Sequence, residues 1–352
     1  MNLRDTYLQL ERESRDYADA DRALATLRRR RTVRQSAGAA GLAAAGLVVA
    51  TLLLQTGGNG GEIAASPTLS VATTPGYAAL PVSGPVGQGA AVYTPCRATC
   101  PTLLSLTDGR EFALGPHTVT PSGNMTLSPD GRWLGLPTLA GYQLRDLLGD
   151  TVVQVPAIGT GGAFSPWVWS ADSRRLILGY HQSGDVSGYL QVDLSTGKQT
   201  TLTPSAGYEP VGILPSGALV LLDESQYGDA ERKRVTLRVD RTDITLTASP
   251  AGVFADADHG LSVQVSGGRI FVLEYTDEQK VAVAEFDTTG NRVQYTVLPD
   301  GDYAMGPTRD GYATVRMPGD QENGRQQVRV GDQVIGEYPG MAEIALPGSA
   351  RH

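Results

Sequence analysis

The chain has 352 residues, is rich in glycine (43) and proline (21), and carries a net charge of −8 at pH 7. Residues 1–35 hold nine arginines and six acidic residues, whereas the remainder holds 20 basic and 31 acidic residues. An acidic body lacks the cations that neutralise phosphates, so this balance excludes general nucleic-acid binding.

The first segment, residues 1–35, has the spacing of an amphipathic helix. An apolar or tyrosine side chain recurs every seven residues from Leu3 to Leu24, and charged residues fill most positions between. The pattern predicts a helix over about residues 3–30. Such a helix would either dock a cytoplasmic partner or rest its arginine-rich end on anionic lipid headgroups.

An uncharged stretch of 18 residues, Ala37 to Leu54, follows. At about 1.5 Å per residue it spans about 27 Å, close to the thickness of a bilayer core. The positive-inside rule predicts a transmembrane helix over residues 36–56, with residues 1–35 in the cytoplasm and the body outside it. A cleaved export signal ending near Ala64-Ala65-Ser66 and a soluble helix are the alternatives. The arginines that set the orientation are Arg28, Arg29, Arg30, Arg31 and Arg34.

Residues 57–75 consist almost entirely of Gly, Ala, Ser, Thr and Pro, which is typical of a flexible tether. In the body, residues 76–346, a turn followed by a short apolar run recurs six times at spacings of 42, 42, 44, 43 and 51 residues. The turns centre on Gly89, Gly131, Ser173, Gly217, Gly260 and Gly311. A second hairpin turn follows several of them, as at Asp108-Gly109, Thr196-Gly197 and Thr289-Gly290.

Two hairpins per repeat make a four-stranded antiparallel sheet, which has two faces to bury and cannot bury them alone. Six such sheets arranged radially cover one another, so the repeats predict an all-β propeller of six four-stranded blades, with seven as the alternative. The ring would close through Ala342–Leu346 or through Tyr77–Val82, and residues 347–352 would form a tail.

Two of the turns carry a motif. Ser128, Pro129, Asp130 and Gly131 begin one, and Ser170 and Asp172 stand at matching positions in the next. These residues resemble the S-P-D-G-K/R-x-L/I signature of TolB-type, WD40-like propeller repeats. The resemblance implies a propeller over residues 76–346 and says little about function. Three lysines against 26 arginines are typical of a high-GC bacterial genome.

The cysteines are Cys96 and Cys100. Both fall on the predicted extracytoplasmic side, where disulfides persist, so we expect a bridge between them, with free thiols as the alternative. Zinc would need two further ligands, and a redox pair usually has two intervening residues rather than three.

No constellation for catalysis, cofactors or metals stands out. The chain has no Gly-x-Ser-x-Gly element, and its four histidines are scattered. The acidic turn at residues 256–260 lacks the glutamate that a calcium loop requires. Trp167 and Trp169, which alternate in a predicted strand, are expected in the core.

These observations favour a membrane-tethered extracytoplasmic propeller that acts, without catalysis, as a binding, sensing or scaffold module. Its partners would be membrane lipid through residues 36–56, an extracytoplasmic protein, glycan or small ligand, and a candidate cytoplasmic partner of residues 1–35. The alternative is an extracytoplasmic enzyme of lactonase, lyase or hydrolase type with a site at the channel mouth.

Overall fold

A computed structural model gives the structure of the protein. It describes residues 76–96, 100–114, 124–158, 163–182, 185–204, 207–229, 231–255, 260–276, 278, 280–319, 324–340 and 342–349. The chain divides into two compact units between Pro67 and Thr68, and every described residue belongs to the second. The predicted helix (1–35), membrane span (36–56) and linker (57–75) therefore lie outside the described residues. Within the described ranges, no helix is long and apolar enough to span a bilayer.

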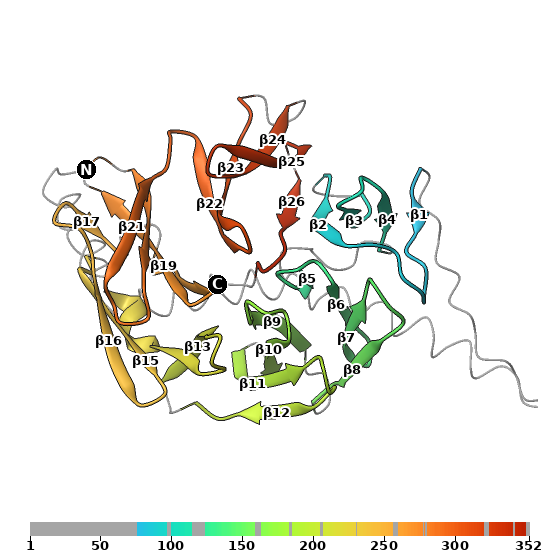
Figure 1. Ribbon diagram of the computed structural model, residues 1–352, viewed down its shortest axis with the longest axis horizontal. Helices are drawn as coiled ribbons and strands as arrows, with labels where there is room; N and C mark the ends of the chain where they lie inside the picture. The colour runs from blue at the N-terminus through green and yellow to red at the C-terminus, as the bar shows by residue number, and fades with distance from the viewer. Residues whose placement is uncertain are drawn as a thin grey trace, which may run out of the picture. The chain divides into compact units, whose positions relative to one another are not determined.

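The second unit is an all-β propeller of six blades, as the repeats predict (Figure 1). Blade 1 contains β1 (Ala78–Ala79), β2 (Gly89–Thr94), β3 (Leu103–Leu106), β4 (Glu111–Ala113) and β26 (Glu343–Ala345). Blade 2 contains β5 (Thr126–Leu127), β6 (Trp133–Thr138), β7 (Gly141–Asp146) and β8 (Val152–Pro156). Blade 3 contains β9 (Ala163–Trp169), β10 (Arg175–Gln182), β11 (Asp185–Asp193) and β12 (Gln199–Leu202).

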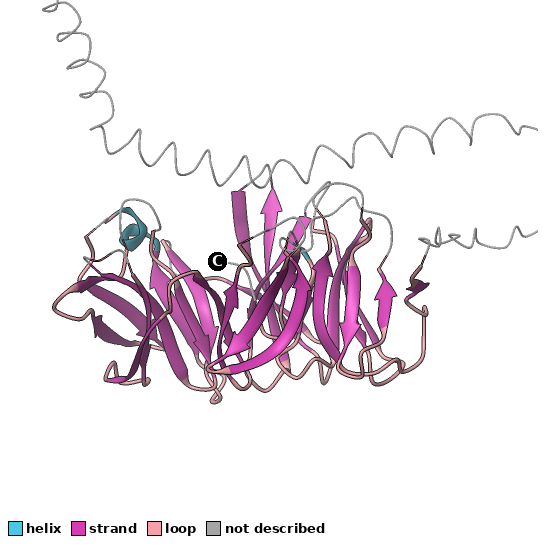
Figure 2. Ribbon diagram, turned by 90° about the horizontal axis from the view of Figure 1, so that it is seen from above, coloured by secondary structure: helices cyan, strands magenta, loops and turns pink. Residues whose placement is uncertain are grey.

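The other three blades follow in chain order. Blade 4 contains β13 (Tyr208–Ile213), β14 (Leu219–Asp223), β15 (Arg234–Val239) and β16 (Thr242–Thr247). Blade 5 contains β17 (Gly252–Val253), β18 (Val263–Ser266), β19 (Arg269–Thr276), β20 (Val281–Phe286) and β21 (Arg292–Val297). Blade 6 contains β22 (Asp302–Thr308), β23 (Gly311–Arg316), β24 (Arg325–Val330) and β25 (Gln333–Pro339). The short 3-10 helix η1 (Glu224–Gly228) follows β14 and lies beside the strand ends (Figure 2).

The hydrophobic core is divided into clusters that lie between neighbouring blades, which is how thin sheets bury their faces in a propeller. Blades 2 and 3, for example, share a cluster that includes Tyr142, Leu144 and Leu176, all fully buried. The cluster between blades 4 and 5 has 18 buried members, whereas the one between blades 5 and 6 has only Phe271, Val283 and Leu298. The packing between blades 5 and 6 is therefore the thinnest.

The ring closes through the C-terminal one of the two segments between which the sequence left a choice, and the other segment adds a strand to the outer edge of blade 1. β26 pairs antiparallel with β2 at the inner edge of blade 1, with Ala345 opposite Val92. β1 pairs parallel with β4 at the outer edge, with Ala78 opposite Phe112. Blade 1 therefore has five strands rather than the four predicted.

The run predicted to be strand-like after Gly260, Leu261–Val265, overlaps β18. β18 pairs at the inner edge of β19, and the hairpin between them turns at Gly267 and Gly268, both with positive φ. The spacing between equivalent strands is longest between blades 4 and 5, from β14 to β19, because η1 and the additional strand β17 are inserted there.

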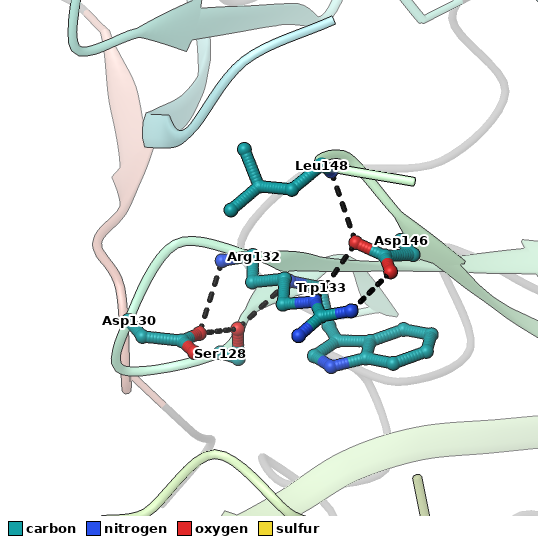
Figure 3. Close-up of polar contacts among 6 residues, drawn as sticks. All are labelled: Ser128, Asp130, Arg132, Trp133, Asp146 and Leu148. Atoms are coloured by element: carbon teal, nitrogen blue, oxygen red, sulfur yellow. Dashed lines mark hydrogen bonds and ion pairs between the residues drawn. The ribbon is translucent and has the colours of Figure 1, made fainter. Parts of the chain in front are cut away.

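The motif residues form a hydrogen-bonded turn (Figure 3). The Ser128 hydroxyl donates to Asp130 Oδ1 at 2.6 Å and accepts from the Trp133 amide at 2.8 Å. Asp130 Oδ1 also accepts from the amide of Arg132 at 3.0 Å. Serine and aspartate thus satisfy backbone amides that the tight turn removes from the β-ladder.

Blade 3 repeats this arrangement. The Ser170 hydroxyl donates to Asp172 Oδ1 at 2.6 Å and accepts from the Arg175 amide at 2.9 Å. The two turns are also joined, because the amide of Asp130 donates to Ser173 Oγ at 3.0 Å. The motif therefore builds and links blade turns.

The Arg132 side chain closes the same turn onto the end of β7 (Figure 3). Its Nε and Nη2 donate to the two carboxylate oxygens of Asp146 at 3.0 and 2.6 Å. The Asp146 side chain is 2 % exposed and the Arg132 side chain 48 %. Burial opposes ionisation of Asp146, but the hydrogen bonds from Arg132 and from the Leu148 amide outweigh it, so the pKa of Asp146 is lowered.

We expect Asp146→Asn to lower the free energy of unfolding by about 1–2 kcal/mol at pH 7, a figure discounted because Arg132 is half exposed. Since the folded pKa lies below the unfolded value of about 3.9, the contribution is complete above that pH and is lost as the pH falls through the folded pKa. Urea denaturation measures this loss, because the free energies of unfolding of the variant and of wild type should lie closer together at about pH 3 than at pH 7. The exposed Asp150→Asn is the control and should match wild type at both pH values. An equal deficit at both pH values would contradict the ion-pair account.

Candidate functional site

A small space lies among the inner strands at the centre of the ring. The space between the inner strands of blades 3 to 6 and the end of the chain has a volume of about 30 Å³, enough for about one water molecule. Trp169, Val211, Val265 and Pro307 come from four inner strands, and Gly348 and Ser349 close the space.

Residues 347–349 are held at the centre by blade 2. The amide of Gly348 donates to the carbonyl oxygen of Leu127 at 2.9 Å, and the hydroxyl of Thr126 donates to the carbonyl oxygen of Ser349 at 3.0 Å. Trp169 Nε1 donates to the same hydroxyl at 2.8 Å. The chain end, which continues from β26 of blade 1, is therefore fixed to blade 2 beside Trp169 of blade 3 and closes the small central space.

A much larger space, of about 600 Å³, opens between blades 5 and 6. We call it the interblade groove. Its walls come from β19, β20, β21 and the residues after β21 on one side, and from β22, β23, β24 and the turn after β24 on the other. Its lining includes Phe271, Val283, Glu285, Gln294, Thr296, Val297, Leu298, Asp302, Asp310, Tyr312, Thr314, Arg329 and Asp332.

The floor of the groove is apolar. Phe271 and Tyr312 lie across it with ring centroids 5.5 Å apart, and Val283 and Leu298 are buried beside them. Burial, assisted by the nearby Tyr275, raises the pKa of the Tyr312 hydroxyl above its ordinary value. Tyr312 is therefore neutral at physiological pH and serves as an apolar surface.

The blade 5 wall is an exposed outer strand. No residue of β21 is buried, and Val293 and Val297 are each 45 % exposed. The corresponding strand of blade 4, β16, buries Ile244 and Leu246 against its neighbour. β21 is therefore less covered than β16, and its contacts with a neighbouring blade are those of Tyr295 with the core between blades 4 and 5 and of Arg292 with the Thr247 carbonyl oxygen.

The blade 6 wall is charged. Asp310 and Asp332 are exposed at two turns and have no side-chain partner among the described residues. Two further acids are paired: Asp302 accepts from Arg316 at 2.6 Å, and Glu285 on the opposite wall lies 3.3 Å from Arg269. The groove therefore combines an apolar floor with two free carboxylates.

Arg329 is the lining cation. Its Nη2 donates to the carbonyl oxygen of Asp332 at 3.2 Å, and its Nε is buried without a hydrogen-bond partner. A guanidinium carries five N–H donors. The buried Nε is out of reach of a ligand, so the donors of Arg329 that remain for one are on its two terminal nitrogens.

The residues singled out from the sequence lie elsewhere. Cys96 and Cys100 are joined by a disulfide with Cα atoms 5.6 Å apart, next to β2 of blade 1. Pro129 contributes to the blade 2 turn, beside Gly348. Arg28, Arg29, Arg30, Arg31 and Arg34 lie outside the described residues.

The predicted core position of Trp167 and Trp169 is confirmed, at 6 % and 3 % exposure. Trp167 Nε1 donates to the carbonyl oxygen of Pro210 in blade 4 at 2.9 Å. The indoles thus bridge blades, and neither lines the groove.

No arrangement suited to metal catalysis is found among the described residues, where no three His, Cys, Asp or Glu side chains gather. His117, His259 and His352 lie outside the described ranges. His181 Nε2 is 2.8 Å from Ser165 Oγ, but Ser165 is only 1 % exposed. Its hydroxyl is therefore out of reach of a substrate.

No family model matches the chain, and no curated protein sequence matches it. Among solved structures, TolB from Acinetobacter baumannii is similar at a TM-score of 0.43 and 17 % identity, over 75 % of this chain and 65 % of TolB. This chain thus spans less than two thirds of that protein.

Two other structures carry different descriptions. A protein described as TolB from Agrobacterium tumefaciens is similar at a TM-score of 0.39 and 13 % identity, over 74 % of this chain and 99 % of that one. The acylaminoacyl peptidase of Pyrococcus horikoshii is similar at a TM-score of 0.40 and 12 % identity, over 72 % of this chain and 53 % of the peptidase. Such likeness concerns the fold alone and carries no argument about function. The chain is a six-bladed β-propeller, and TolB proteins are among its structural neighbours.

Proposed function

We propose that this propeller is a non-catalytic binding module, tethered to the cell membrane through residues 36–56 and exposed outside the cytoplasm. One observation carries the binding function: the centre of the ring offers about 30 Å³, whereas the interblade groove offers about 600 Å³. Ligand sites in proteins are typically concave and of about 300–1,000 Å³. The groove is in that range and the centre is not.

The small central space also bears on the enzyme alternative. A catalytic site at the channel mouth needs inner-strand side chains that converge on an open space. Here Gly348 and Ser349 occupy that space and are hydrogen-bonded to Leu127 and Thr126. The described inner-strand residues around it are mainly apolar, with Gln264 as the polar exception.

Photo-crosslinking in cells tests the binding function. A photoreactive amino acid at Val297, in the groove, should form a discrete crosslinked product with a partner. The control is Val152 on β8 of blade 2, which is similarly exposed, 38 % against 45 %. A product from both positions, or from neither, would contradict a groove-based binding module.

The tether and the location are tested separately. Alkaline phosphatase is active only outside the cytoplasm, so a fusion after His352 should be active and should stay with the membrane fraction after a carbonate wash. Replacing the arginines at positions 28–31 and 34 with asparagine should reduce this activity, because they set the orientation. An active but freely soluble fusion would indicate a cleaved signal, and an inactive one would overturn the location.

A further inference from the structure

We propose that the interblade groove binds a segment of a partner protein in extended conformation, in which basic side chains alternate with apolar ones. The segment would lie along β21 as an added strand of blade 5. This inference rests on the proposed binding function and specifies the chemistry of its partner.

The backbone argument comes from the outer edges of the blades. β21 is the last strand of blade 5 and, within the described ranges, pairs only with β20, so its other edge carries free N–H and C=O groups. In blade 1 the equivalent edge of β4 is covered by β1, which pairs with it in parallel. The fold therefore already accommodates a fifth strand at this position, and strand addition is a common way to bind peptides.

The apolar positions of the ligand follow from β21 itself. Side chains alternate between the faces of a strand, so Val293 and Val297, each 45 % exposed, lie on one face, and Gln294 and Thr296 lie on the face that lines the groove. Apolar side chains of an added strand would lie beside the two valines and remove them from water, and the alternate side chains would face the groove.

The charges of the ligand follow from the blade 6 wall. Asp310 and Asp332 are free carboxylates, so lysine or arginine side chains complement them. Arg329 has donors left for backbone carbonyl groups of the same segment. An extended polypeptide supplies both partners at once, whereas an acidic ligand would be repelled at the rim.

A synthetic nine-residue peptide of alternating valine and lysine, with a fluorescent label, is the probe. We expect it to bind the full-length protein in detergent, measured by fluorescence anisotropy, and a valine–glutamate peptide to bind at least tenfold more weakly. Asp310→Asn combined with Asp332→Asn should lower the affinity for the lysine peptide at least tenfold. The control Asp150→Asn, which removes an exposed carboxylate on blade 2, should leave that affinity unchanged.

Strand addition is tested by N-methylating alternate residues of the peptide, which keeps its charge and removes donors on one edge. One of the two methylation registers should lose at least tenfold in affinity while the other keeps it. Equal binding of all peptides, or no effect of the aspartate substitutions, would overturn the inference. So would self-association of the chain that Val297→Lys abolishes, since a second copy would then be the occupant. If Val297 still crosslinks to a partner in cells, the binding module stands although its proposed ligand chemistry fails.

Discussion

A chain truncated after residue 342 is expected to lose the cooperative unfolding of the propeller. The truncation removes β26, which pairs with β2, and Leu346, which is 3 % exposed. Burial of one leucine contributes about 2–3 kcal/mol. The three residue pairs between β2 and β26 and the hydrogen bonds of residues 348–349 are lost with it. We expect a loss of about 5 kcal/mol, comparable with the whole stability of many domains.

Differential scanning calorimetry measures this effect as a lower and broader transition. The matched control ends at Ser349 and removes only residues 350–352, so it keeps every described contact of the chain end and should unfold like wild type. Equal transitions for all three proteins would mean that blade 1 closes without β26. Adding residues 343–352 as a separate peptide should restore part of the lost transition temperature, because the inner edge of blade 1 stays available.

The repeats predicted the architecture because each blade carries its own local signals. The turns at Gly109, Gly197 and Gly290 all have positive φ and join the strands that the sequence places around them. These signals depend on residues a few positions apart, so they can be read without the tertiary structure.

The position of a strand within its blade could not be predicted after Gly260. A turn followed by the alternating run Leu261–Val265 has the same pattern whether the run becomes the innermost strand or the second one. The pairing decides, and here β18 is the inner neighbour of β19, whose sequence is equally strand-like. Local pattern cannot rank two strands of similar propensity.

The groove could not be predicted for a related reason. Its walls come from β21 and β24, whose sequences alternate as ordinary half-buried strands do. The groove exists because blade 6 presents Thr314 and Arg329 to β21 where other blades present large apolar side chains. Such a mismatch between two blades appears only when the faces that meet are known. Free acidic residues beside glycine turns, at Asp310 and Asp332, were the one available signal.

Gly131→Ala is expected to destabilise the propeller by about 3 kcal/mol, far more than a surface glycine would. Gly131 has φ +67°, which costs an L-residue about 1 kcal/mol. An added Cβ would also overlap the carbonyl oxygen of Gly89, where the backbones of blades 1 and 2 are joined by a 2.8 Å hydrogen bond from the Gly89 amide to the Gly131 carbonyl. Relieving that overlap means separating the two blades, and overpacking of this kind costs about 1–3 kcal/mol.

The control for this substitution is Gly109→Ala. Gly109 has a similar φ of +85°, but an added Cβ there would have no neighbour within 4 Å, so only the conformational cost of about 1 kcal/mol applies. Urea denaturation of both variants separates the two contributions, since they share the backbone cost and differ in the contact. Equal losses would mean that the blades can move apart freely at this turn. A larger loss for Gly131→Ala would establish the close backbone contact between blades 1 and 2 as a part of the fold that accepts no side chain.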